Sequence, residues 1–61
     1  MERFEMYEKV NGRYYFMGWY PMEDENRCIN TKTRVINNHT HLYKTYKFND
    51  NTIRELKYII D

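Results

Sequence analysis

The sequence predicts an α+β fold in which a four-stranded antiparallel sheet, opening with an Asn-Gly hairpin, is packed by one C-terminal helix. Three observations predict it. Two aromatic and apolar runs flank an Asn-Gly dipeptide, two β-branched or aromatic runs follow, and a capped apolar stripe with helical spacing ends the chain. At 61 residues the chain is expected to form one domain, residues 1–61, of a size that buries only a modest core.

The N-terminal hairpin is predicted over residues 3–20. Asn11 and Gly12 tolerate the positive φ that both central positions of a type I′ turn need, so this dipeptide is the strongest short-range hairpin signal. An unbroken ladder from the turn pairs Val10 with Arg13. Because side chains alternate along a strand, the register then assigns every side chain to one of two faces.

Both faces of this predicted hairpin carry rings. One face is predicted to hold Phe4, Met6, Val10, Tyr15, Met17 and Trp19. The other is predicted to hold Tyr7, Tyr14, Phe16 and Tyr20, interleaved with Arg3, Glu5, Lys9 and Gly18. Four rings of about 150–250 Å² each make a larger apolar patch than a monomer usually leaves in water. The sequence therefore predicts a partner-binding surface formed by Tyr7, Tyr14, Phe16, Tyr20, Arg3 and Lys9.

Two further strands are predicted at about residues 28–36 and 42–48, where β-branched and aromatic residues gather. Pro21 ends the hairpin because it cannot donate to a ladder, and an acidic loop follows at 22–26. Residues 37–41 are predicted to form the turn between the two strands.

The C-terminal helix is predicted over about residues 51–60. Thr52 and Glu55 have the spacing of a capping box. Apolar residues recur at i, i+3 and i+7, as Ile53, Leu56 and Ile60. A helix of this length runs about 13 Å, so we expect it to cover part of one sheet face and to leave the second aromatic face free.

The segment from Phe48 to Lys57 resembles the last strand and helix of single-stranded DNA-binding domains of the positive-cofactor-four type. In that family a large apolar residue, an Asn cap and an apolar-x-x-Leu helix end a ββββα unit. The resemblance implies a dimer whose strands form a basic, aromatic channel for a single strand. Independently of the resemblance, the last two predicted strands carry cations that could contact the phosphates of a nucleic acid, namely Lys32, Arg34, Lys44 and Lys47.

Composition indicates the cellular compartment in which the protein acts and the kind of genome that encodes it. Ten Lys and Arg oppose nine Asp and Glu, so no field of one sign indicates a polyanion or a membrane surface. Cys28 is the only cysteine, which excludes an internal disulfide, and no signal peptide or membrane span is visible. Ala, Ser and Gln are absent while Asn, Ile, Lys and Tyr abound. A short Met-initiated chain with such AT-rich codon usage suggests a phage or mobile-element protein acting in the host cytoplasm.

No catalytic motif is visible. The absence of serine excludes a serine-based triad. His39 and His41 would lie on one side of an extended segment, and Cys28 is a third soft ligand, but structural zinc usually needs four ligands with tight pair spacing. A nuclease that uses these histidines with Arg34 has no supporting spacing. We therefore expect no metal, no cofactor and no enzymatic activity.

The predicted function is that of a small non-enzymatic inhibitor of phage or mobile-element origin. It would block a host or defence macromolecule, a protein or a ribonucleoprotein of the kind that anti-CRISPR proteins target, through its aromatic sheet face or its acidic loop, because Tyr and Arg commonly anchor protein interfaces. The alternative is a single-stranded nucleic-acid-binding module that uses the same rings for stacking. Homodimerisation through that face would place the partner site elsewhere. The sequence names neither the target nor a role for Cys28, His39 and His41.

Overall fold

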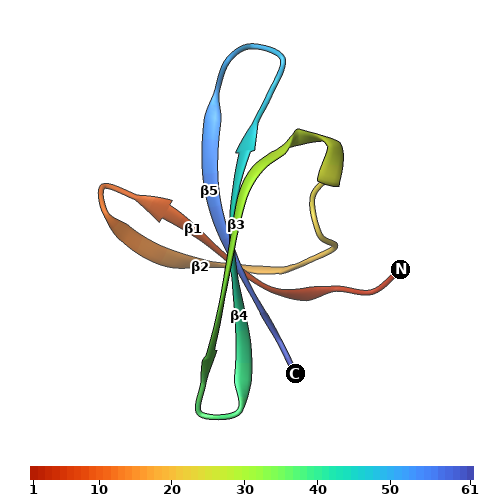
Figure 1. Cartoon of the computed structure of the whole chain (residues 1–61), viewed down its shortest axis with the longest axis vertical. Coiled ribbons are helices and arrows are strands. Elements are labelled where there is room, and N and C mark those ends of the chain that lie inside the picture. Colours follow the sequence, from red (N-terminus) through yellow and green to blue (C-terminus); the bar gives the residue numbers. More distant parts are fainter.

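The computed structural model describes residues 1–61 and contains a single five-stranded antiparallel sheet with the strand order β2-β1-β5-β4-β3. Its elements are β1 (Phe4–Val10), β2 (Arg13–Tyr20), the 3-10 turn η1 (Glu25–Arg27), β3 (Cys28–Ile36), β4 (His39–Lys47) and β5 (Ile53–Ile60). The sheet twists so strongly that its three hairpin loops point in different directions (Figure 1). The chain has no helix that could span a membrane.

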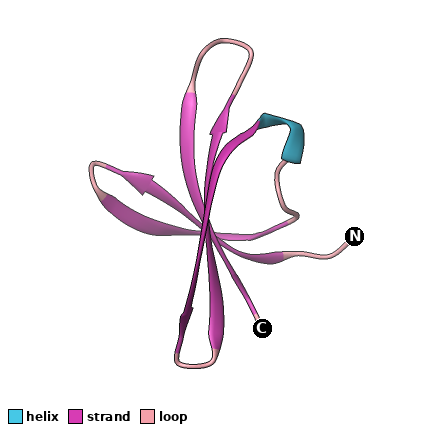
Figure 2. Cartoon of the chain, viewed as in Figure 1, coloured by secondary structure: helices cyan, strands magenta, loops and turns pink.

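The predicted C-terminal helix is wrong, and the fold is all-β (Figure 2). Residues 53–60 form β5, which pairs with β1 on one side and β4 on the other. Pairing with two neighbours overrides the weak helical pattern. The Asp50 side chain accepts a hydrogen bond from the Thr52 N–H at 3.0 Å, within a hairpin loop and not at a helix start. The ββββα topology implied by the family resemblance is therefore not present.

Two tight turns of the same kind close the first and second hairpins. Asn11 and Gly12 have φ values of 53° and 81°, and Asn37 and Asn38 have φ values of 50° and 66°. Both pairs meet the positive-φ requirement of a two-residue hairpin loop. The predicted turn over 37–41 was therefore too long, and β4 begins at His39.

A β-bulge in β2 changes the register that the sequence predicted. Tyr7 pairs with Phe16 but Met6 pairs with Gly18, so Met17 is an extra residue. Gly18 has a φ of 120°, a backbone conformation that side chains disfavour. The bulge exchanges the faces of the last two residues of β2: Trp19, and not Tyr20, lies on the face of Tyr7 and Phe16.

The core occupies one side of the sheet, which we call the core face. It consists of Met6, Tyr46, Leu56 and Tyr58, all at most 7% exposed. Because no helix is present, the connection between β2 and β3 covers this face. Met22 packs against the core, and the Glu23 N–H donates to the Tyr58 hydroxyl at 3.1 Å. Residues 22–26, which were expected to form an exposed acidic loop, therefore cover the core.

The cations of the central strands on the core face are neutralised. The Lys44 side chain is 7% exposed, and its Nζ donates to Glu25 Oε1 at 2.8 Å. Arg54 donates to Glu8 through Nε at 2.9 Å and through Nη2 at 2.6 Å, a two-bond pairing. These hydrogen bonds hold the pKa of Glu8 below its usual value.

Candidate functional site

The opposite side of the sheet, which we call the open face, has no covering segment. Direct cross-strand partners share a face, so the register defines its members. They are Glu5, Tyr7, Lys9, Tyr14, Phe16, Trp19, Asn30, Lys32, Arg34, Ile36, His39, His41, Tyr43, Thr45, Lys47, Ile53, Glu55, Lys57 and Ile59.

Lys57 lies at the centre of the open face, surrounded by three tyrosine rings. Its Nζ is 4.6 Å from the ring centroid of Tyr7, 5.1 Å from that of Tyr14 and 5.9 Å from that of Tyr43. An ammonium group within about 6 Å of a ring centroid is attracted by the negative ring face. One cation from the central strand β5 therefore holds rings from β1, β2 and β4 together.

The sheet brings Tyr14 of β2 and Tyr43 of β4 together although β1 and β5 lie between them. In a flat sheet these strands would be about 14 Å apart, from three spacings of about 4.8 Å. The two ring centroids are nevertheless only 5.7 Å apart, with the rings edge to face. The twist of the sheet and the inclination of the Tyr14 and Tyr43 side chains thus bring the two rings together above Lys57.

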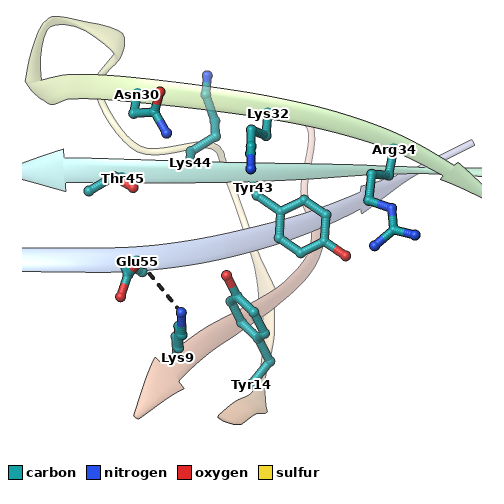
Figure 3. Close-up of a pocket in the computed structure, with 9 residues that line it drawn as sticks. All are labelled: Lys9, Tyr14, Asn30, Lys32, Arg34, Tyr43, Lys44, Thr45 and Glu55. Atoms are coloured by element: carbon teal, nitrogen blue, oxygen red, sulfur yellow. Dashed lines mark ion pairs between the residues drawn. The ribbon is translucent and has the colours of Figure 1, made fainter. Parts of the chain in front are cut away.

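A groove of about 360 Å³ lies beside these two rings (Figure 3). On the open face it is lined by Lys9, Tyr14, Asn30, Lys32, Arg34, Tyr43, Thr45 and Glu55. The lining is mostly polar and cationic, and only Glu55 is acidic. Such a groove fits an anionic ligand that also presents hydrogen-bond acceptors.

Charge is distributed unevenly between the two faces. The open face carries five cations and two carboxylates, whereas the whole chain has a formal charge of only +1. Lys9 is 3.8 Å from the Glu55 carboxylate, and Lys32 and Arg34 have no ion-pair partner. The near-neutral composition therefore conceals a positive face, which favours anionic ligands.

Two further rings of β2 are exposed on the open face. Phe16 is 54% exposed and Trp19 is 58% exposed. Tyr7 packs on one side of Phe16, with ring centroids 5.3 Å apart. A half-exposed ring supported from one side offers a flat apolar surface on which another ring can stack.

Tyr14 and His41 of this face are held in their neutral forms near pH 7. Burial, with the nearby Glu55 carboxylate and Tyr43, raises the pKa of Tyr14. Burial and the adjacent Lys57 cation lower the pKa of His41. The Tyr14 hydroxyl therefore keeps its proton and can donate a hydrogen bond to an anion in the groove.

The structure places the predicted partner-binding residues in three locations. Tyr7, Lys9, Tyr14 and Phe16 lie together on the open face. Tyr20 lies on the core face opposite Phe4, because of the bulge. Arg3 is exposed before β1 begins.

The predicted phosphate-binding cations also divide between the faces. Lys32 and Arg34 lie on the open face at the groove, and Lys47 lies on the same face at the end of β4. Lys44 lies on the core face, paired with Glu25, and in Figure 3 its side chain points away from the two tyrosines. Lys44 is therefore not available to a ligand on the open face.

Sequence reasoning missed Lys57, Tyr43 and Trp19. Lys57 was assigned to the helix, although Ile53, Glu55, Lys57 and Ile59 alternate with the buried residues of the same segment. Trp19 was assigned to the wrong face. Gly18 within a strand was a signal for the bulge that moves it.

The residues considered for a metal site do not come together. The chain has no group of three or more His, Cys, Asp and Glu side chains that could hold a metal ion. His39 Nδ1 contacts the Asp61 carboxylate. Cys28 lies at the far end of the β3–β4 ladder, opposite Tyr46.

The chain matches no protein-family model, and no curated protein or solved structure is similar to it at a significant level. Any functional argument must therefore depend on the side chains themselves.

Proposed function

We propose that this chain is a small non-enzymatic module that binds single-stranded nucleic acid across its open face. The observation that supports it is the combination, on one side of one sheet, of free aromatic rings with cations that have no carboxylate partner. Proteins that bind single strands use a positively charged groove along the backbone and aromatic side chains on which bases stack. The proposal depends on these side chains and not on the ββββα topology of the family that the sequence resembles.

Each group on the open face has a part in this proposal. Phe16 and Trp19 stack unpaired bases, because their rings are more than half exposed. Lys32 and Arg34 contact phosphates from the wall of the groove. Tyr14 donates a hydrogen bond from its protonated hydroxyl, and Lys57 keeps Tyr7, Tyr14 and Tyr43 in place.

The binding is expected to be weak and strongly dependent on salt. If Lys32, Arg34 and Lys47 neutralise three phosphates, the logarithm of the affinity falls with the logarithm of salt concentration with a slope of about −2. This slope corresponds to a roughly 20-fold loss between about 50 mM and about 200 mM salt. Stacking of bases on the aromatic rings adds a contribution to the binding free energy that depends little on salt.

Fluorescence anisotropy with labelled single-stranded DNA and RNA of about 12 nucleotides tests the proposal. Phe16→Ala and Trp19→Ala should each weaken binding about 5- to 150-fold, because stacking on an aromatic ring contributes about 1–3 kcal/mol per base. Tyr20→Ala is the matched control, since Tyr20 is a half-exposed ring of the same strand on the opposite face. Lys32→Ala and Arg34→Ala should each reduce the salt slope by about 0.7. Absence of binding at about 50 mM salt would refute the proposal.

A protein target, as expected of a phage or mobile-element inhibitor, is the second candidate. The exposure of Phe16 and Trp19 favours it, because aromatic residues anchor protein interfaces. A capture experiment from nuclease-treated host lysate distinguishes the two. A protein retained after nuclease treatment, but lost with Tyr14→Ala and Phe16→Ala, supports this candidate. Capture that nuclease abolishes supports nucleic acid.

A further inference from the structure

Glu55 is the one acidic side chain in a groove whose other charged groups are cations. Its side chain is 46% exposed, and the Lys9 ammonium lies 3.8 Å from its carboxylate, which is longer than a hydrogen bond. An ionised carboxylate repels phosphate, and it accepts hydrogen bonds but cannot donate them. Glu55 is therefore unsuited to holding a phosphate, and its oxygens are open to a ligand group that donates hydrogen bonds.

The register places Glu55 across the groove from the free cations of β3. In one row, Thr45 of β4 lies between Asn30 of β3 and Glu55 of β5. In the next row, Tyr43 pairs with Lys32. β3 and β5 are two strand spacings apart, about 10 Å, and Figure 3 shows Lys32 and Glu55 on the two sides of β4. The groove is therefore cationic on one side and carries a hydrogen-bond acceptor on the other.

A nucleotide has the same polarity. Its phosphate is negative, and the Watson–Crick edge at the other end of the molecule carries hydrogen-bonding groups that proteins read in single strands. Among the common bases only guanine has two adjacent donors on that edge, the N1–H and the 2-amino group. These two donors match the two oxygens of a carboxylate, as the two donors of an arginine do. Adenine, cytosine, thymine and uracil each place an acceptor beside the donor, and this acceptor would face a carboxylate oxygen.

We propose that the groove binds one guanine nucleotide of a single strand, with Glu55 accepting from the base edge and Lys32 and Arg34 holding the adjacent phosphate. The base lies across β4, against the Tyr14 and Tyr43 rings that line the groove. Glu55 is then the residue that determines base specificity. This guanine preference rests on the proposed binding of single strands and adds to it the base that is recognised.

Fluorescence anisotropy with labelled thymidine oligonucleotides of about 12 nucleotides tests the preference. One strand carries a single central guanosine, and a second carries inosine at the same position. Inosine lacks only the 2-amino group of guanosine, so the charge of the strand and the size of the ring system do not change. Wild type should bind the guanosine strand at least about 5-fold more tightly than the inosine strand, which is the low end of the range for a specific base contact.

Glu55→Gln leaves only one acceptor oxygen and should abolish the difference between the guanosine and inosine strands. Glu5→Gln is the matched control, because Glu5 is the other carboxylate of the open face and does not line the groove. Both variants remove one negative charge from the same face, so a general electrostatic effect would appear in both. Only Glu55→Gln should change the ratio of the two affinities, and circular dichroism verifies that both variants fold.

Three outcomes would overturn the guanine assignment. Equal wild-type affinity for the guanosine and inosine strands would remove it and leave single-strand binding intact. A ratio that survives in folded Glu55→Gln would show that another group reads the base. Binding of neither strand at about 50 mM salt would refute the proposed function and the guanine preference together. The wild-type comparison needs no variant, so it decides the matter even if Glu55→Gln does not fold.

Discussion

The two faces of this sheet contain similar kinds of side chain in different environments. On the core face, Tyr46 and Tyr58 are buried and Lys44 is paired with Glu25. On the open face, Phe16 and Trp19 are more than half exposed, and the central cation Lys57 contacts tyrosine rings in place of a carboxylate. The difference arises from residues 21–27. This segment covers the core face and supplies Glu25, the carboxylate that pairs with Lys44.

This comparison shows that composition alone does not separate a core from a binding surface. Successive residues of β4 and β5 lie on opposite faces, so each strand contributes tyrosine or lysine to both faces. A ring becomes part of the core when another segment removes it from water, and a cation becomes structural when a carboxylate is held beside it. Where neither happens, the same residues remain free to contact a ligand.

The largest expected difference between the faces is in packing. Leu56 is 1% exposed, and Leu56→Ala should lower the free energy of unfolding by about 2–5 kcal/mol through lost burial and a cavity. Ile53 of the same strand lies on the open face at 50% exposure, and Ile53→Ala should cost below about 1 kcal/mol. Urea unfolding measures both. Equal losses would show that the open face is also buried.

The next difference concerns the ion pairs. Glu25→Gln leaves the Lys44 ammonium buried without its carboxylate and should destabilise the protein by about 1–3 kcal/mol. Adding Lys44→Met should recover most of this loss, because it removes the buried charge. On the open face, Glu55→Gln removes the exposed 3.8 Å contact with Lys9 and should change stability by less than about 0.5 kcal/mol. An equal effect of the two Glu→Gln changes in thermal unfolding would contradict the assignment of the faces.

The smallest effect is a pH dependence on the core face. The hydrogen bonds from Arg54 lower the pKa of Glu8 in the folded state below its usual value of 4.5. The stabilisation is therefore fully present above pH 4.5 and is lost as the pH falls through the lower, folded-state pKa. Wild type should exceed Glu8→Gln in stability by about 1–2 kcal/mol at pH 7, and the gap should narrow towards pH 3. A gap that does not change with pH would show that the carboxylate charge contributes nothing.

Sequence predictions that depend on neighbouring residues were correct, and those that depend on contacts between distant residues were not. Asn11-Gly12 identified the first hairpin because two residues contain all the information about that turn. β3 occupies residues 28–36, as expected from its β-branched run. The open-face cluster was found in part, through Tyr7, Tyr14 and Phe16, because their register depends only on the distance from that turn. After the bulge at Met17, the predicted alternation assigned Trp19 and Tyr20 to the wrong faces.

The C-terminal segment shows why the remainder required the structure. Its residues fit both a helix with apolar positions at i, i+3 and i+7 and a strand with alternating burial. The pairing that decides between them joins β5 to β1, about 50 residues earlier in the chain, as in the pairs of Met6 with Tyr58 and of Glu8 with Leu56. No local signal carries that information.

The sequence by itself determined the Asn11-Gly12 turn, the strand character of the aromatic runs that precede residue 48, and the presence of more rings than a small core needs. Only the tertiary structure decided that the last segment is a central strand, that residues 21–27 cover the core, and that Lys57 joins three tyrosines. The physical reason is that turns depend on the φ preferences of adjacent residues. Burial and charge pairing depend on which distant segments meet, and that is decided by the free energy of the whole fold.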